Sequence, residues 1–134
     1  MKLSTKGRYG LRAMVDLAVH SETGPVSIQS IGNRQDISVS YLEQLVGKMR
    51  RAGLVTSVRG ATGGYRLAKS PSEISVGDVL RALEGTLDAV DCPGNLEVST
   101  CKASQKCVTK YVWKKINESI SQAVDTIMIE QLVQ

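Results

Sequence analysis

Apolar side chains recur three and four positions apart in several stretches of the chain, and this spacing predicts amphipathic α-helices. The first helix covers residues 9–19 and has Ser4 or Thr5 as its capping residue. A short helix follows Ser27, and a longer helix follows Ser38. The longer helix turns four apolar residues inward: Leu42, Leu45, Val46 and Met49. Two helices joined by a tight turn have the outline of a helix-turn-helix.

A β-hairpin is predicted directly after the longer helix. Gly53 fits the position just past the helix end, and Leu54–Val58 has the composition of a strand. A glycine-rich turn over residues 59–64 leads to a return strand at Tyr65–Leu67. A hairpin in this position is the wing of a winged helix-turn-helix. We therefore expect residues 1–69 to form a DNA-binding domain.

The remaining residues, 70–134, predict a dimerisation region. Ser75 caps a helix that Gly85 closes, and residues 86–107 carry little apolar periodicity. A long helix is expected over residues 108–125. One of its faces is apolar throughout: Val108, Val112, Ile116, Ile120, Ala123 and Ile127.

This long helix is too one-sided to pack wholly on a small winged helix, so a helix from a second subunit is expected to cover its apolar face. Thr126 begins a short terminal helix that ends in Leu132 and Val133. The expected fold is mainly α with a small β-hairpin, a winged helix-turn-helix followed by a long C-terminal dimerisation helix.

Charge is distributed unevenly between the two regions. The whole chain of 134 residues has a net charge of +4. Residues 1–69 hold eleven Lys and Arg against four Asp and Glu, a net charge of +7, whereas residues 70–134 hold six against nine, a net charge of −3. A basic region attached to an acidic one favours a module that binds a polyanion.

Composition narrows the class of protein further. Hydrophobic residues make up 42% of the chain and Phe is absent, which predicts a core built from aliphatic side chains. There is no run of 18 apolar residues and no apolar N-terminal stretch, so we expect a cytoplasmic protein with no membrane span. One histidine and no nucleophile–base arrangement argue against an enzyme.

The recognition helix and the wing tip carry the residues that we expect to contact double-stranded DNA. They are Ser38, Ser40, Tyr41, Glu43, Gln44, Lys48, Arg50, Arg59 and Gly60. Gln44 can pair with adenine through two hydrogen bonds, and Glu43 can accept one from a cytosine amine. Ser40 and Tyr41 suit phosphates, and Arg59 suits a narrow minor groove. The competing interpretation is an ordinary solvated surface.

Three cysteines, Cys92, Cys101 and Cys107, lie within sixteen residues. An odd number of cysteines argues against a disulfide framework, and their spacing matches neither a zinc ribbon nor a bacterial ferredoxin. Inert cysteines and a zinc site remain alternatives. Clustered thiols in a polar segment favour ligands of an iron–sulfur cluster.

Five motifs in this chain resemble those of the Rrf-two (IscR/NsrR/CymR) family of bacterial winged-helix regulators. They are STKGRYG at 4–10, SYLEQL at 40–45, AGLV at 52–55, VRG at 58–60 and GGY at 63–65. The resemblance implies a homodimer crossed through the long helix and bound to a pseudo-palindromic promoter. It also implies that Ser40, Tyr41, Glu43, Gln44 and Arg59 match positions that contact DNA.

The cysteine segment is most similar to that of the family's iron–sulfur members that regulate cluster biogenesis. This similarity favours a [2Fe–2S] cluster over a [4Fe–4S] cluster, and a repressor of cluster biogenesis genes. The fourth ligand is unknown, because Lys110 stands where those members have a histidine. Asp88, Asp91, Glu97 and His20 are the other candidates. Alternative functions are an NsrR-like nitric oxide sensor and a CymR-like repressor of cysteine metabolism.

Overall fold

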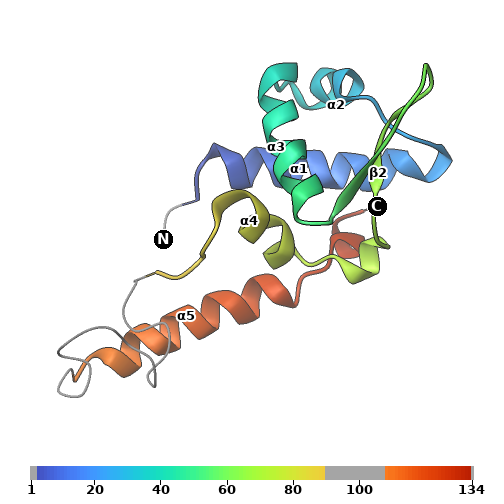
Figure 1. Ribbon diagram of the computed structural model, residues 1–134. Helices are drawn as coiled ribbons and strands as arrows, with labels where there is room; N and C mark the ends of the chain where they lie inside the picture. Colours follow the sequence, from blue (N-terminus) through green and yellow to red (C-terminus); the bar gives the residue numbers. More distant parts are fainter. Residues whose placement is uncertain (1–2, 90–107, 134) are drawn as a thin grey trace.

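The computed structural model describes residues 3–89 and 108–133, and it is mainly helical with one two-stranded hairpin, as the sequence predicts (Figure 1). The elements in chain order are α1 (Thr5–His20), η1 (Ser21–Thr23), α2 (Ile28–Gln35), α3 (Val39–Arg51), β1 (Val55–Val58), β2 (Gly64–Leu67), η2 (Pro71–Glu73), α4 (Val76–Glu84), α5 (Lys110–Asp125) and η3 (Ile129–Leu132). None of the described helices combines the length and the apolar composition that crossing a bilayer requires.

Serine side chains begin four of the five α-helices, and all four were predicted as caps. The hydroxyl oxygens of Ser4, Ser27, Ser38 and Ser75 each accept a hydrogen bond from a backbone N–H in the first turn that follows. At α4 the cap is reciprocal, because the carboxylate of Asp78 accepts a hydrogen bond of 3.0 Å from the backbone N–H of Ser75. Local sequence therefore determines where these helices start.

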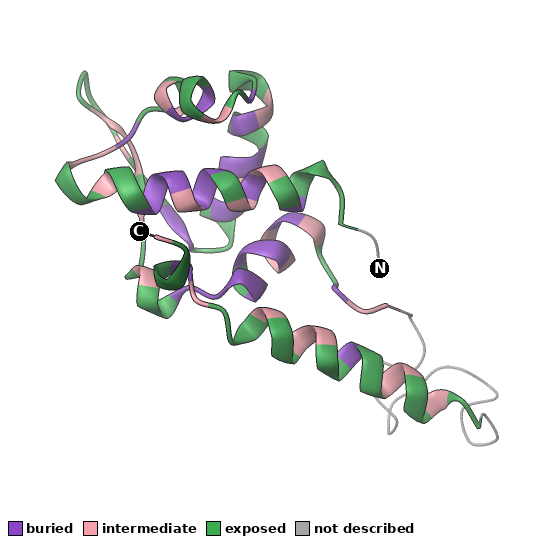
Figure 2. Ribbon diagram, turned by 180° about the vertical axis from the view of Figure 1, so that it is seen from behind, coloured by how far each residue is buried: buried purple, intermediate pink, exposed green. Residues whose placement is uncertain are grey.

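Helix α1 is the centre of the core. Figure 2 shows its buried residues on the side that faces α3 and α4. The largest fully buried side chains come from six elements and the segments between them: Met14, Leu17, Ile31, Leu42, Leu45, Val46, Met49, Val55, Ile74, Val79 and Ile129. Residues from both halves of the sequence thus share one aliphatic core.

Two glycines let α1 approach α4 closely. A Cβ atom at Gly7 would lie 3.2 Å from a methyl carbon of Leu80, and one at Gly10 would overlap a methyl carbon of Leu83. The side chain of Leu83 is itself buried, so it has no room to move aside. The Gly-x-x-Gly spacing at 7–10 is therefore the sequence feature that permits this helix crossing.

The hairpin forms where it was predicted, and it pairs in the antiparallel sense from Val55 opposite Leu67 to Val58 opposite Gly64. Its second strand also pairs with Val26, which exchanges two backbone hydrogen bonds of 2.8 Å with Tyr65. Gly64 allows this contact, because a Cβ there would overlap the carbonyl oxygen of Val26. The base of the wing is thus held against the body of the protein.

Two predicted boundaries in the C-terminal region were wrong. The long helix begins at Lys110 rather than at residue 108, because Val108 lies in a turn and Thr109 occupies the position before the first helical residue. The terminal helix begins at Ile129 rather than at Thr126. Met128, just before this helix, is extended, and its backbone forms a bridge with Ser75.

Helix α5 packs on α4 along one face and leaves another face exposed (Figure 2). Ile120 and Val124 contact the cluster of Val76, Leu80 and Leu87. On the exposed face, the accessible fraction is 49% for Val112 and 37% for Ile116, and Ile127 is also exposed. This exposed face agrees with the predicted apolar face, except that Ile120 is partly covered within the same chain.

We predict that Gly10→Ala lowers the free energy of unfolding by about 1–3 kcal/mol, because the added methyl group overlaps buried Leu83. Gly47→Ala is the matched control in a different helix. A Cβ at Gly47 meets only the guanidinium of Arg51 at 3.6 Å, so alanine there is expected to stabilise by about 0.5–1 kcal/mol. Urea unfolding of both variants measures these changes, and equal effects would contradict close α1–α4 packing.

Candidate nucleic-acid interface and cysteine segment

A buried carboxylate fixes the first helix of the helix-turn-helix on α1. The side chain of Asp16 is only 1% exposed, and its two oxygens accept hydrogen bonds of 2.9 Å and 2.7 Å from the guanidinium of Arg34. The side-chain amide of Gln35 donates a third hydrogen bond of 2.9 Å. Both donors lie in the last turn of α2, so this network sets how α2 sits on α1.

Opposing effects act on the pKa of the Asp16 carboxyl group. Burial raises it, whereas the hydrogen bonds from Arg34 and Gln35 and the positive charge of Arg34 lower it. The net result is a pKa below the ordinary value for aspartate. Sequence reasoning missed this network, although a charged residue among the apolar positions of a helix is the signal that a buried ion pair gives.

The exposed side chains at the start of α3 project from the face that was predicted to read bases. Ser40, Glu43 and Gln44 are exposed, and so is Arg50 near the end of the helix. Ser38 uses its hydroxyl oxygen to cap the helix, at 3.3 Å from the backbone N–H of Tyr41. The structure thus leaves exposed, near the start of α3, both predicted base-reading residues, Glu43 and Gln44, and the predicted phosphate contact Ser40.

Tyr41 and Lys48 lie on a different edge of α3. They are seven residues apart, so they share one face of the helix two turns apart. The hydroxyl groups of Tyr41 and Thr5 share a hydrogen bond of 2.7 Å, and the Tyr41 ring meets Tyr9 edge-on with centroids 6.2 Å apart. This edge therefore borders the first turns of α1, a neighbour that sequence reasoning did not identify.

The wing extends on the same side of the molecule as α2 and the N-terminal end of α3 (Figure 1). Arg59 and Gly60 lie at its exposed tip. Gly60 has φ +114°, a conformation that side chains with a Cβ rarely adopt. The predicted wing residues and the predicted residues at the start of α3 thus lie on one side of the molecule.

The three cysteines lie outside the described residues, but the chain on either side of them is positioned by α5. Before the segment, the backbone N–H of Ala89 donates a hydrogen bond of 2.8 Å to the side-chain oxygen of buried Asn117. After it, the chain enters α5 at Lys110. These two points are about 10 Å apart along the helix axis. Within residues 3–89 and 108–133, no three His, Cys, Asp or Glu side chains gather as a metal site.

Two of the candidate fourth ligands have other interactions. The ammonium group of Lys110 lies 5.3 Å from the ring centroid of Tyr111, in a cation–π contact. The Nδ1 atom of His20 lies 2.9 Å from the carbonyl oxygen of Asp16, at the C-terminal end of α1. Figure 1 places that end on the opposite side of the molecule from the start of α5. Asp88 is half-buried and lies just before the cysteine segment, whereas Asp91 and Glu97 lie outside the described residues.

A helix-turn-helix with an adjoining β-hairpin wing and a basic recognition surface defines a winged-helix transcriptional regulator. The Rrf2 (Rrf-two) family profile, described as iron-dependent transcriptional regulator, matches residues 3–134. The chain belongs to this family.

Relatives and solved structures agree with this assignment. The chain is 46% identical over 133 residues to the HTH-type transcriptional regulator IscR of Aliivibrio salmonicida, covering 99% of this chain and 77% of that protein. The structure of IscR from T. potens is 47% identical with a TM-score of 0.77, covering 98% of this chain and 85% of that one. The structure of CymR, the global cysteine regulator of B. subtilis, is 39% identical with a TM-score of 0.79, covering 98% and 95%.

We predict that Asp16→Asn lowers the free energy of unfolding by about 2–3 kcal/mol at pH 7, because charge-assisted hydrogen bonds to Arg34 are lost. The lowered pKa means that the stabilisation is complete above the unfolded-state pKa, about 3.9, and is lost as pH falls through the folded-state value. The difference between wild type and variant should therefore shrink below about pH 4. Asp36→Asn, at an exposed residue, is the control. A difference that does not depend on pH would contradict this assignment.

Proposed function

We propose that the protein is a cytoplasmic, homodimeric repressor that reports iron–sulfur status to the promoters of cluster biogenesis genes. The observation that carries the proposal is the placement of three cysteines between a DNA-binding unit and the helix expected to join two subunits. The relative position of the DNA-binding unit and the dimerisation helix sets the spacing of the two recognition helices. A change at the cysteines, which lie between them in the sequence, can therefore alter that spacing. The family membership and the similarity to IscR proteins support it.

For DNA recognition, we assign base contacts to Glu43 and Gln44, which are exposed in the first turns of α3. We assign backbone contacts to Ser38, Ser40, Tyr41, Lys48, Arg50 and Gly60, and a minor-groove contact to Arg59. A homodimer would read a pseudo-palindromic promoter site with one such surface on each half-site.

The homodimer is supported by the exposed apolar face of α5. Val112 and Ile116, which are one turn apart on α5, are exposed in the isolated chain, and so is Ile127 just after the helix. Such a contiguous apolar face is typical of a surface that another helix covers. A second copy of the same face is self-complementary across a two-fold axis. Residues 70–134 would therefore act as the dimerisation region and residues 1–69 as the DNA-binding domain.

The donor chemistry suits an iron–sulfur cluster. Cys92, Cys101 and Cys107 supply three thiolates, the ligand type that iron in such clusters prefers. When bound, the cluster would supply a group whose presence depends on iron, sulfide and oxidants. We favour the [2Fe–2S] type because the chain is similar to IscR proteins. The fourth ligand is assigned to a carboxylate, Asp88, Asp91 or Glu97, since a lysine would first have to lose a proton at a cost of roughly 4–5 kcal/mol.

A row of contacts connects the chain before the cysteines to the recognition helix. Glu84, the last residue of α4, accepts hydrogen bonds of 2.6 Å from both the backbone N–H and the hydroxyl of Ser4. The next residue, Thr5, shares its hydroxyl with Tyr41 on α3. A displacement of the end of α4 would therefore reach α3 through a single turn of α1. This route supports control of DNA binding from the cysteine segment.

Specific observations also favour two alternative functions, a CymR-like repressor and an NsrR-like nitric oxide sensor. The high structural similarity to CymR favours a repressor of cysteine metabolism, which would need no cluster. Three cysteines in the same segment would also serve an NsrR-like sensor in which nitric oxide attacks the cluster. Iron content separates the first alternative from our proposal, and loss of DNA binding at near-stoichiometric nitric oxide identifies the second.

We predict that protein purified without oxygen is coloured and contains about two irons and two sulfides per chain, because three thiolates hold a [2Fe–2S] cluster. Cys101→Ala should lose the colour and the iron, whereas Ser104→Ala, in the same segment, should keep both. Metal analysis and absorbance measure these contents. About four irons per chain would select the [4Fe–4S] type. A colourless, iron-free dimer that binds its promoter fully would overturn the proposal in favour of the CymR-like function.

A further inference from the structure

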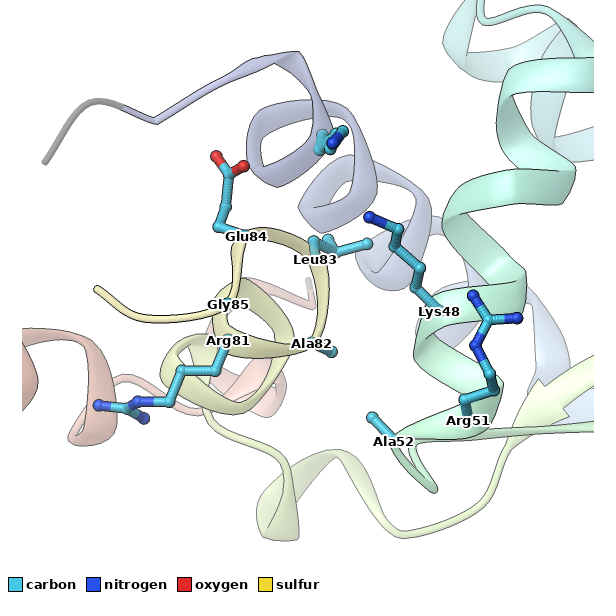
Figure 3. Close-up of a pocket in the computed structure, with 9 residues that line it drawn as sticks. Lys48, Arg51, Ala52, Arg81, Ala82, Leu83, Glu84 and Gly85 are labelled. Atoms are coloured by element: carbon cyan, nitrogen blue, oxygen red, sulfur yellow. The ribbon is translucent and has the colours of Figure 1, made fainter. Parts of the chain in front are cut away.

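A basic groove lies next to the recognition helix, on the side away from the wing. It has a volume of about 550 Å³ and is formed where the first turn of α1, the last turns of α3 and the end of α4 meet (Figure 3). Small residues, Ala52, Ala82 and Gly85, form part of its walls and leave it open to solvent. Four cations line it: Lys6 from α1, Lys48 and Arg51 from α3, and Arg81 from α4.

The other charged residues of the groove are engaged elsewhere. The guanidinium of Arg81 donates hydrogen bonds of 2.6 Å and 3.1 Å to the carboxylate of Asp125 on α5, and Figure 3 shows it pointing away from Lys48 and Arg51. Both oxygens of Glu84 accept hydrogen bonds from Ser4, and the charge of Lys6 acts on this carboxylate from a greater distance. Among the described residues, no carboxylate lies within 4.0 Å of the charged nitrogens of Lys6, Lys48 or Arg51. The groove therefore presents positive charge to solvent.

The hydroxyl pair of Thr5 and Tyr41 lies on the same two helices, α1 and α3, that supply three of the four cations. Lys48 is two turns along α3 from Tyr41 on the same face, and Lys6 follows Thr5 directly in α1. Two hydroxyls that share one hydrogen bond use one of their two hydrogens, so one O–H group remains to donate to a further acceptor. Hydroxyl and ammonium donors thus follow one edge of the recognition helix.

We infer that this edge, formed by Thr5, Lys6, Tyr41, Lys48 and Arg51, binds backbone phosphates of DNA. The inference rests on the proposed DNA binding and deepens it, because it adds Thr5, Lys6 and Arg51 to the backbone contacts already assigned to Tyr41 and Lys48. An open, elongated row of donors suits a polyanionic strand, whereas a small free anion is held better in an enclosed site. Contacts of this kind position the protein and carry no sequence preference.

The test measures the affinity of the full-length dimer for DNA at several salt concentrations. Each phosphate contact contributes about one to the slope of log affinity against log salt concentration. Lys6→Ala and Lys48→Ala should each lower that slope by about one, on the promoter and on a random duplex alike. Raising salt from about 50 to 200 mM would then weaken each variant about four-fold less than wild type. Alanine is a good helix former, so both helices are retained.

Lys69→Ala is the matched control, since Lys69 is an exposed lysine after the end of β2 that lies away from the wing tip. Its slope should equal that of wild type. If Lys6→Ala also keeps the wild-type slope while Lys48→Ala lowers it, the inference is overturned while the proposed DNA binding stands. Wild type that binds no duplex at all would instead refute the proposed function. Stabilisation of wild type but not of Lys6→Ala by inorganic phosphate, with unchanged slopes, would assign the groove to a free anion and overturn the inference.

Discussion

The close crossing of α1 over α4 is the constraint on which the other contacts depend. Glycines at 7 and 10 bring the two backbones together, and Leu83 fills the space that side chains would have taken. At the same contact between α1 and α4, Glu84 accepts two hydrogen bonds from Ser4, the residue that caps α1. Helix α1 also bonds to α2 through Asp16 and to α3 through Thr5. It therefore positions both helices of the helix-turn-helix.

Sequence reasoning succeeded where structure is determined locally. Serine caps at Ser4, Ser38 and Ser75 start helices because each hydroxyl satisfies a backbone N–H within its own first turn. Apolar spacing along α3 identified its buried face for the same reason, since a helix repeats every 3.6 residues whatever surrounds it. The wing was predicted from a glycine-rich turn between two short strands, a pattern that also lies within one segment of the sequence.

The features that sequence reasoning missed all join segments far apart in the chain. Asp16 is eighteen residues from Arg34, and Thr5 is thirty-six residues from Tyr41, so no local pattern pairs them. Residues 127–128 lost their predicted helical conformation for the same reason, since pairing with the backbone around Ser75 prevailed over local preference. In the candidate site, exposure on α3 followed from periodicity, but the neighbours of Tyr41 and Lys48 depended on how α1 and α4 pack.

The arrangement places one turn of α1 between the approach to the cysteine segment and the helix that reads DNA. We propose that the state of the cysteines changes how the two recognition helices of the dimer contact DNA. The most direct measurement is the affinity of cluster-loaded and cluster-free protein for one promoter fragment and for a panel of variant sites under the same salt conditions. We predict that the cluster-loaded and the cluster-free protein differ in DNA affinity or in site preference. Equal affinity together with equal site preference would contradict it.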